Sequence, residues 1–257
     1  KFTLLLRGVF LENNGSKNLL ISITDLTNLR KLESFRSEFV ANVSHEIKTP
    51  LTGILSASEL LDDIASSPET SKCVKILKTQ SQRLNSLVDD ILSLSSLESA
   101  SPSKYENFKT ENLADIIRES IAICRDKASQ KEVSLNLKEC EDTETKCDRK
   151  LLEQAVTNLI FNAIKYSQSK NVDISLSRSA NNAKITVKDY GIGIAKEHAE
   201  RIFERFYRVD KNRSRELGGT GLGLAIVKHV AWLHGGDASL KSEPKEGAEF
   251  SISIPIK

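Results

Sequence analysis

The chain has 257 residues, of which 39% are hydrophobic and 28% are charged, and its formal net charge at pH 7 is +2. This length allows one or two domains with a sizeable core. The near-neutral charge gives no support for a generally basic surface, and we expect no direct nucleic-acid partner. The 4 cysteines form no Cys-x-x-Cys pair and have no His at metal-ligand spacing, which excludes the usual zinc and disulfide frameworks.

Membrane-spanning and secretory segments are not visible in the sequence. No apolar run approaches the roughly 20 residues that a spanning helix needs. The chain contains no Met and opens directly in a strand-like run, without a signal peptide. We therefore expect the cytoplasmic portion of a longer protein, with any inner-membrane anchor upstream.

Two strand-like runs open the chain, at residues 2–11 and 18–24, joined by a turn at 13–16. A two-stranded hairpin alone is marginally stable. We therefore interpret residues 1–27 as the last hairpin of a truncated sensor domain. Its exit, Asp-Leu-Thr at 25–27, is similar to that of PAS sensor domains, and an ordinary helix cap is the alternative interpretation.

Residues 28–98 carry two long amphipathic helical patterns. Apolar residues recur in steps of mostly three or four from Leu29 to Ile64, and again from Val74 to Leu97. The break at 66–69 predicts an antiparallel helical hairpin. One hairpin leaves part of its apolar surface uncovered, whereas two hairpins close into a four-helix bundle, so we predict a homodimer.

The first of these helices carries a candidate reactive site. His45, Glu46 and Thr49 lie on adjacent parts of one helical surface. Free imidazole has a pKa of about 6.5, so it is largely neutral and nucleophilic at cytosolic pH, and a nearby carboxylate can take up its proton. We interpret His45 as a phosphate acceptor, against the alternative of a solvated or core His. Pro50 predicts a bend, because its ring collides with the carbonyl of Glu46.

A Ser-rich linker, residues 99–109, leads to a mixed pattern of helices and strands over 110–257. The order of these elements predicts a sheet covered by helices on one face, with Trp232 and Leu233 in its core. Asp148 is a good N-cap for the second helix. The patterns predict helices at 112–129, after 148 and at 221–234, and strands at 133–137, 171–177, 183–188, 238–242 and 248–255.

Several segments of this domain carry residue types that suit a nucleotide. Asn158, Asn162 and Lys165 recur one turn apart, and amide oxygens can ligate Mg²⁺ while an ammonium reaches phosphate. Asp189 follows a strand and precedes a Gly-Ile-Gly turn that lets the backbone approach a ligand. The Gly-rich segment 218–224 opens a helix, whose free N–H groups suit a polyphosphate. Each segment alone is a weak signal.

In their order behind a His-Glu-x-x-Thr-Pro helix, together with a Phe-Glu-Arg-Phe segment at 203–206, these segments resemble the H, N, G1, F and G2 boxes of sensor histidine kinases of two-component systems. The resemblance covers about residues 25–257. It implies an α plus α/β fold: an antiparallel hairpin that forms a dimeric four-helix bundle for phosphotransfer (HisKA), followed by an α/β sandwich that binds ATP (HATPase_c, of GHKL or Bergerat type).

The resemblance also implies residue roles. Asn158 and Asn162 would hold Mg²⁺, Lys165 would face the phosphates, Tyr166 the base, and Asp189 the adenine amino group. Arg208 would contact phosphate from a lid. The residues that would shape the pocket are Gly191, Gly193, Gly219, Thr220, Gly221 and Gly223.

The implied activity is transfer of the γ-phosphoryl group of ATP to His45, with Glu46 as base, and then to an Asp of a response regulator. Thr49 would position water for dephosphorylation of that regulator. Asn158 stands where gyrase-like relatives carry a water-activating Glu, and an amide cannot act as a base at neutral pH. This favours His45 as acceptor over two alternatives, a GHKL-type ATPase and a non-catalytic dimeric signalling module.

Overall fold

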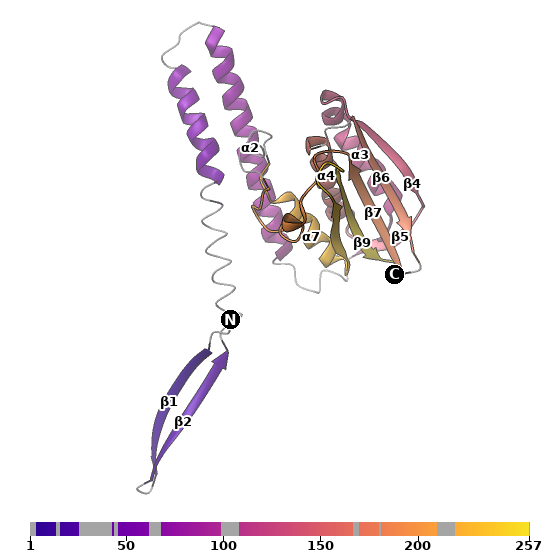
Figure 1. The fold of residues 1–257 in the computed structure, drawn as a ribbon. Helices are drawn as coiled ribbons and strands as arrows, with labels where there is room; N and C mark the ends of the chain where they lie inside the picture. The colour runs from indigo at the N-terminus through magenta and orange to yellow at the C-terminus, as the bar shows by residue number, and fades with distance from the viewer. Residues whose placement is uncertain are drawn as a thin grey trace.

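The computed structural model describes residues 4–13, 16–25, 43, 46–61, 68–98, 108–166, 170–179, 181–209 and 219–256. These residues form a β-hairpin, a helical hairpin and an α/β domain (Figure 1). Within these ranges, no helix is both long and apolar enough to cross a bilayer. His45 and residues 26–42 lie outside the described part of the chain.

The β-hairpin consists of β1 (Leu4–Asn13) and β2 (Ser16–Asp25), which pair antiparallel from Leu4↔Asp25 to Asn13↔Ser16. It projects away from the rest of the molecule (Figure 1), and Leu6 and Ile21 are exposed on it. The predicted hairpin is confirmed. Its origin in a PAS-like domain stays a prediction.

The helical hairpin pairs residues 46–61 with α2 (Pro68–Glu98). The helices are antiparallel, because Glu46 reaches Arg83 while Gly53, farther along the chain, lies against Gln80. The first helix continues through Pro50. Apolar side chains remain exposed on both helices, including Leu55 at 55% and Leu92 at 63%. This uncovered surface is what the predicted dimer would bury.

The α/β domain is built on a five-stranded sheet of order β4-β6-β7-β9-β8, in which β4 and β6 are parallel and the other pairs antiparallel. Buried and partly exposed residues alternate along β6 and β7, as expected when one sheet face is covered. Helices α3, α4 and α7 pack together and on the sheet, which confirms the predicted architecture. The elements of the domain are β3 (Lys109–Asn112), α3 (Leu113–Gln130), β4 (Ser134–Cys140), β5 (Glu144–Cys147), α4 (Arg149–Tyr166), β6 (Asn171–Arg178), β7 (Asn182–Asp189), α5 (Lys196–Ala199), α7 (Gly223–Leu233), β8 (Asp237–Ser242) and β9 (Ala248–Pro255).

Two features differ from the expectations. Strands β3 and β5 form a separate two-stranded sheet, which the polar sequence of β3 did not indicate. Trp232 was expected in the core but is 60% exposed, whereas Leu233 is 4% exposed. Successive residues of a helix point about 100° apart because one turn takes about 3.6 residues, so adjacent positions of α7 face opposite environments.

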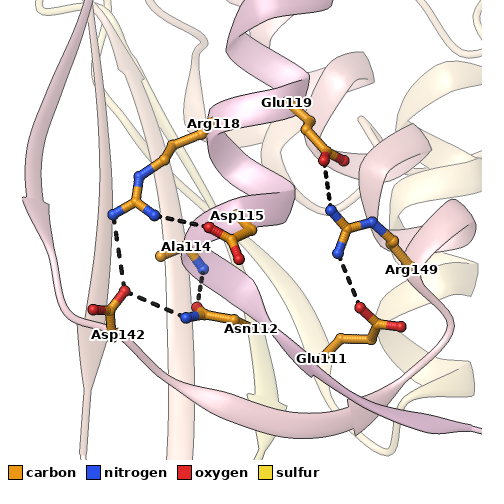
Figure 2. A network of polar contacts seen from close by, with 8 residues as sticks. All are labelled: Glu111, Asn112, Ala114, Asp115, Arg118, Glu119, Asp142 and Arg149. Atoms are coloured by element: carbon orange, nitrogen blue, oxygen red, sulfur yellow. Dashed lines mark hydrogen bonds and ion pairs between the residues drawn. The ribbon is translucent and has the colours of Figure 1, made fainter.

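A polar network fixes the end of α4 that lies away from Asn158 and Tyr166. Arg149, the first residue of α4, binds Glu111 at 2.9 Å and Glu119 at 2.6 Å (Figure 2). Asn112 caps α3 by accepting from the Ala114 amide at 2.9 Å. The network connects β3, α3 and α4 and holds the N-terminal end of α4 in place. The C-terminal half of α4 extends from that end.

His234 is buried in a single neutral tautomer. Its Nδ1 contacts the carbonyl oxygen of Val230 at 2.7 Å and therefore carries the proton, which leaves Nε2 to accept from the Asp148 amide at 3.1 Å. The ring of Phe108 stacks on it with centroids 4.6 Å apart. Burial lowers the pKa of His234.

We predict that His234 makes stability fall on acidification. Its pKa in the folded protein lies below the ordinary 6.5, so the unfolded chain binds more protons and stability is lost as pH drops below that value toward the folded pKa. The free energy of unfolding, measured in urea between about pH 7 and about pH 5, should depend less steeply on pH in His234→Gln. His198→Gln should keep the original slope. Equal slopes for all three proteins would contradict the prediction.

Candidate functional site

A cavity of about 570 Å³ lies between α4, the start of α7, the end of β7 and helix α2. Its volume falls in the range of small-molecule sites. Residues separated by more than sixty positions meet here, since Asn158 and Thr220 both line it. The sequence had assigned both positions to one nucleotide site.

The far half of α4 supplies amides and an ammonium. Asn158, Asn162, Lys165 and Tyr166 all line the cavity. Asn158 Nδ2 donates to the carbonyl oxygen of Gly223 at 3.4 Å, which leaves its Oδ1 as an acceptor. Amide oxygens suit a hard cation, so this helix face fits Mg²⁺. The described residues contain no group of three or more His, Cys, Asp or Glu that could hold a metal ion.

One end of the cavity is rich in positive charge. The pKa of Lys165 falls to about 8, first because the ammonium is buried and then because Arg208, Lys127 and Lys131 are nearby cations. Lys127 and Lys131 also line the cavity. Sequence reasoning missed these two, which lie four positions apart in the last turn of α3 and at its C-cap. This end suits a polyphosphate.

Asp189 closes the β7 end of the cavity. Its carboxylate is 4% exposed and accepts from the Gly191 amide at 2.8 Å. Burial raises the pKa of Asp189, and hydrogen bonds from the backbone of Gly191 and Ala248 oppose that shift. A carboxylate here can accept from an amino group of a ligand.

The glycine positions follow from backbone geometry. Gly193 has φ +68°, and a Cβ on it would overlap the carbonyl oxygen of Glu243. Gly221 has φ +77°, and a Cβ on it would lie 2.9 Å from Cα of Phe206. Gly219 and Gly223 also line the cavity. Turns in the left-handed region thus bring the main chain against the site.

Helix α2 forms one wall of the cavity, through Ser86, Asp89 and Asp90. The Thr220 hydroxyl donates to Asp90 Oδ2 at 2.6 Å, and burial raises the pKa of that carboxyl. The sequence had given Thr220 a role in pocket shape and had missed Asp90. The sequence signal for Asp90 is its position on α2. It lies seven positions after Arg83, beside the apolar stripe of the helix.

Arg208 connects the cavity to the helix of residues 46–61, which begins one position after the candidate acceptor in the chain. It lines the cavity, and its Nη2 lies 2.9 Å from Glu46 Oε2. Arg83 Nη2 lies 3.3 Å from the same oxygen. The side chain of Arg208 is 5% exposed, and its buried Nε has no hydrogen-bond partner within the part of the chain that the structure describes. Thr49 is partly buried one turn from Glu46.

Two family profiles match the chain. Residues 35–100 match the His Kinase A (phospho-acceptor) domain, and residues 147–257 match the histidine kinase-, DNA gyrase B-, and HSP90-like ATPase. The chain belongs to the sensor histidine kinase family. The predicted fold class, a helical hairpin followed by an α/β domain of the histidine kinase type, is confirmed for this chain.

Relatives of the kinase include sensor-like histidine kinase SenX3 of Mycolicibacterium smegmatis, 38% identical over 248 residues, which cover 95% of this chain and 64% of that protein. Sensor protein SrrB of Staphylococcus aureus is 32% identical over 95% of this chain and 42% of its own length. The chain therefore spans less than two thirds of either relative.

Solved structures share the fold. Acinetobacter baumannii histidine kinase AdeS has a TM-score of 0.67 at 26% identity, over 83% of this chain and 98% of that one. Histidine kinase ThkA, solved in complex with response regulator protein TrrA, has a TM-score of 0.68 at 24% identity, over 98% of this chain and 75% of that one. The likeness to ThkA is one of fold.

We predict that Gly221→Ala destabilises the kinase by about 1–2 kcal/mol, because a left-handed conformation strains any residue with a Cβ. Contact with Phe206 adds to this. Gly53→Ala is the control, since its Cβ would meet only the flexible Gln80 side chain in a helix, and it should be neutral or stabilise by up to about 1 kcal/mol. Urea unfolding measures both, and equal stabilities would contradict the prediction.

Proposed function

We propose that this kinase transfers the γ-phosphoryl group of ATP to His45, and that the group then passes to an Asp of a response regulator. One contact carries the proposal: Arg208 of the cavity binds Glu46, the residue bonded to His45. Consecutive Cα atoms are about 3.8 Å apart, so a cavity cation binds the immediate chain neighbour of the acceptor.

The cavity has separate features for each part of ATP. Lys165, Lys127 and Lys131 give the positive end for the triphosphate, and Asp189 gives the acceptor for the adenine amino group. The orphaned Nε of Arg208 fits a phosphate oxygen. The oxygens of Asn158 and Asn162 would hold Mg²⁺, which neutralises charge on the phosphates.

His45 and Glu46 would share the chemistry at the acceptor. One imidazole nitrogen forms the new N–P bond while the bond from phosphorus to the ADP oxygen breaks and ADP leaves. The proton on the other ring nitrogen moves to the Glu46 carboxylate. Asn158 offers no base to activate water in the same cavity, which favours the imidazole over hydrolysis.

The kinase would act as a homodimer, as the cytoplasmic part of a longer sensor. The exposed apolar side chains of the hairpin, such as Leu55 and Leu92, suit burial in a four-helix bundle with a second copy. We propose a response regulator as phosphoryl acceptor and, through Thr49 positioning water, as substrate of a phosphatase activity.

We predict that Mg-ATP labels the chain with phosphate that is labile in acid and stable in alkali. His45→Gln should carry no label, and chelation of Mg²⁺ should abolish labelling of the original protein. His198→Gln is the control and should label normally. Steady phosphate release without labelled protein would instead support a water-using ATPase, and absence of ATP binding a non-catalytic module.

We predict that Thr49→Ala separates two activities. Labelled kinase is first mixed with the receivers of its own genome to find the regulator that accepts phosphate fastest. Thr49→Ala should label and transfer as before, but should dephosphorylate that regulator at least about tenfold more slowly, because general positioning of a reactant is worth this much or more. Thr52→Ala, one turn away on an exposed position, is the matched control. An unchanged dephosphorylation rate would refute the phosphatase role.

A further inference from the structure

Arg83 belongs to helix α2 of the hairpin, yet it shares a carboxylate oxygen with a cation of the cavity. Both Arg83 and Arg208 donate to Glu46 Oε2, at 3.3 and 2.9 Å. The three side chains are 11%, 5% and 13% exposed for Arg83, Arg208 and Glu46. Three segments of the chain thus bring two guanidinium groups to one carboxylate, away from bulk solvent.

Several cations lie near one another at this end of the cavity. Arg83 and Arg208 are both close enough to Lys165 to lower its pKa, together with burial. Buried charges require partners, and the guanidinium groups of Arg83 and Arg208 share one carboxylate oxygen of Glu46. Among the described residues, the Nε of Arg208 has no hydrogen-bond partner. An anion with several oxygens would complete the cluster.

The position of Arg83 on α2 fits such an anion. Ser86 and Asp90 line the cavity, and Arg83 lies on the same helix face because the three residues are spaced by three and four. Arg83 is therefore at the edge of the cavity, on the side of Glu46.

We propose that Arg83 is a phosphate-binding residue for the terminal phosphate of ATP, and that this phosphate takes the two arginines from Glu46. The proposal rests on the function proposed above. Without a terminal phosphate, the Glu46 carboxylate is the anion that Arg83 and Arg208 bind. With one, the phosphate oxygens bind Arg83 and Arg208, and the Glu46 carboxylate turns to the imidazole of His45. ADP lacks the terminal phosphate and leaves Glu46 paired.

The test compares ATP and ADP affinities of the full chain by calorimetric titration, in Arg83→Met, Arg83→Lys and the control Lys78→Met, which removes an exposed cation from the same helix. Arg83→Met should weaken ATP binding by about tenfold or more, the size expected for a lost hydrogen bond to a charged group, and ADP binding by less than about twofold. Arg83→Lys should recover part of the loss. Lys78→Met should change neither affinity.

Glu46→Gln gives a second, opposite readout. Removal of the competing carboxylate charge should tighten ATP binding relative to ADP, while labelling of His45 slows. If Arg83 only supported the hairpin through Glu46, both Arg83→Met and Glu46→Gln would leave the ratio of ATP to ADP affinity unchanged, and that result would overturn the proposal. Failure of the proposed function is distinct, since the original protein would then not label.

Discussion

Helix α2 is the constraint on which the arrangement of this kinase depends. Its 31 residues span about 46 Å at about 1.5 Å per residue. The first half pairs with residues 46–61, and the second half packs on α7 and contributes Leu94 and Leu97 to the core of the α/β domain. Because one uninterrupted helix serves both halves, the position of the hairpin and the shape of one cavity wall change together.

The polar residues of α2 make this coupling electrostatic as well as mechanical. Arg83 reaches Glu46, Asp90 holds Thr220 of the glycine loop, and Ser93 hydrogen-bonds Gln154 of α4. A shift of the helix by one turn would break all three contacts at once. A structural change in the cavity can therefore be transmitted to the hairpin through several contacts.

Burial is the main cause of the pKa shifts of three residues that line the cavity. The pKa values of Asp189 and Asp90 are raised and that of Lys165 is lowered, each mainly by loss of solvent. Every one of these groups is thus shifted toward its neutral form, which is the opposite of what strong ion pairing would produce. A ligand that brings complementary charge and hydrogen bonds relieves this penalty, so the site is preorganised for a polar, charged molecule.

Local patterns predicted the elements whose signals are local. The period of apolar residues gave both helices of the hairpin, and the cap at Asp148 gave the start of α4, where its carboxylate accepts from the Leu151 amide. Strand β3 was not predicted, because its four residues are all polar and show no alternation of polar and apolar positions. Pairing with β5 decides its conformation. Glycine and asparagine spacing pointed to some of the residues that line the cavity, among them Asn158, Asn162 and Gly221. Arg83 could not be assigned, and the spacing on α2 was the only signal for Asp90, because tertiary packing is what brings α2 to the cavity.

His229 of α7 and its C-cap residue His234 connect the α/β domain to the end of the hairpin and to the start of the domain. His229 donates to the carbonyl oxygen of Leu97 at 3.2 Å, and His234 stacks on Phe108, so the chain leaves the hairpin and enters the α/β domain at the same helix. The ten peptide steps from 98 to 108 reach at most about 36 Å when fully extended. If the contacts at α7 open, the α/β domain can therefore lie no farther than that reach from the end of its own hairpin, which keeps the local concentration of one part of the chain at the other high.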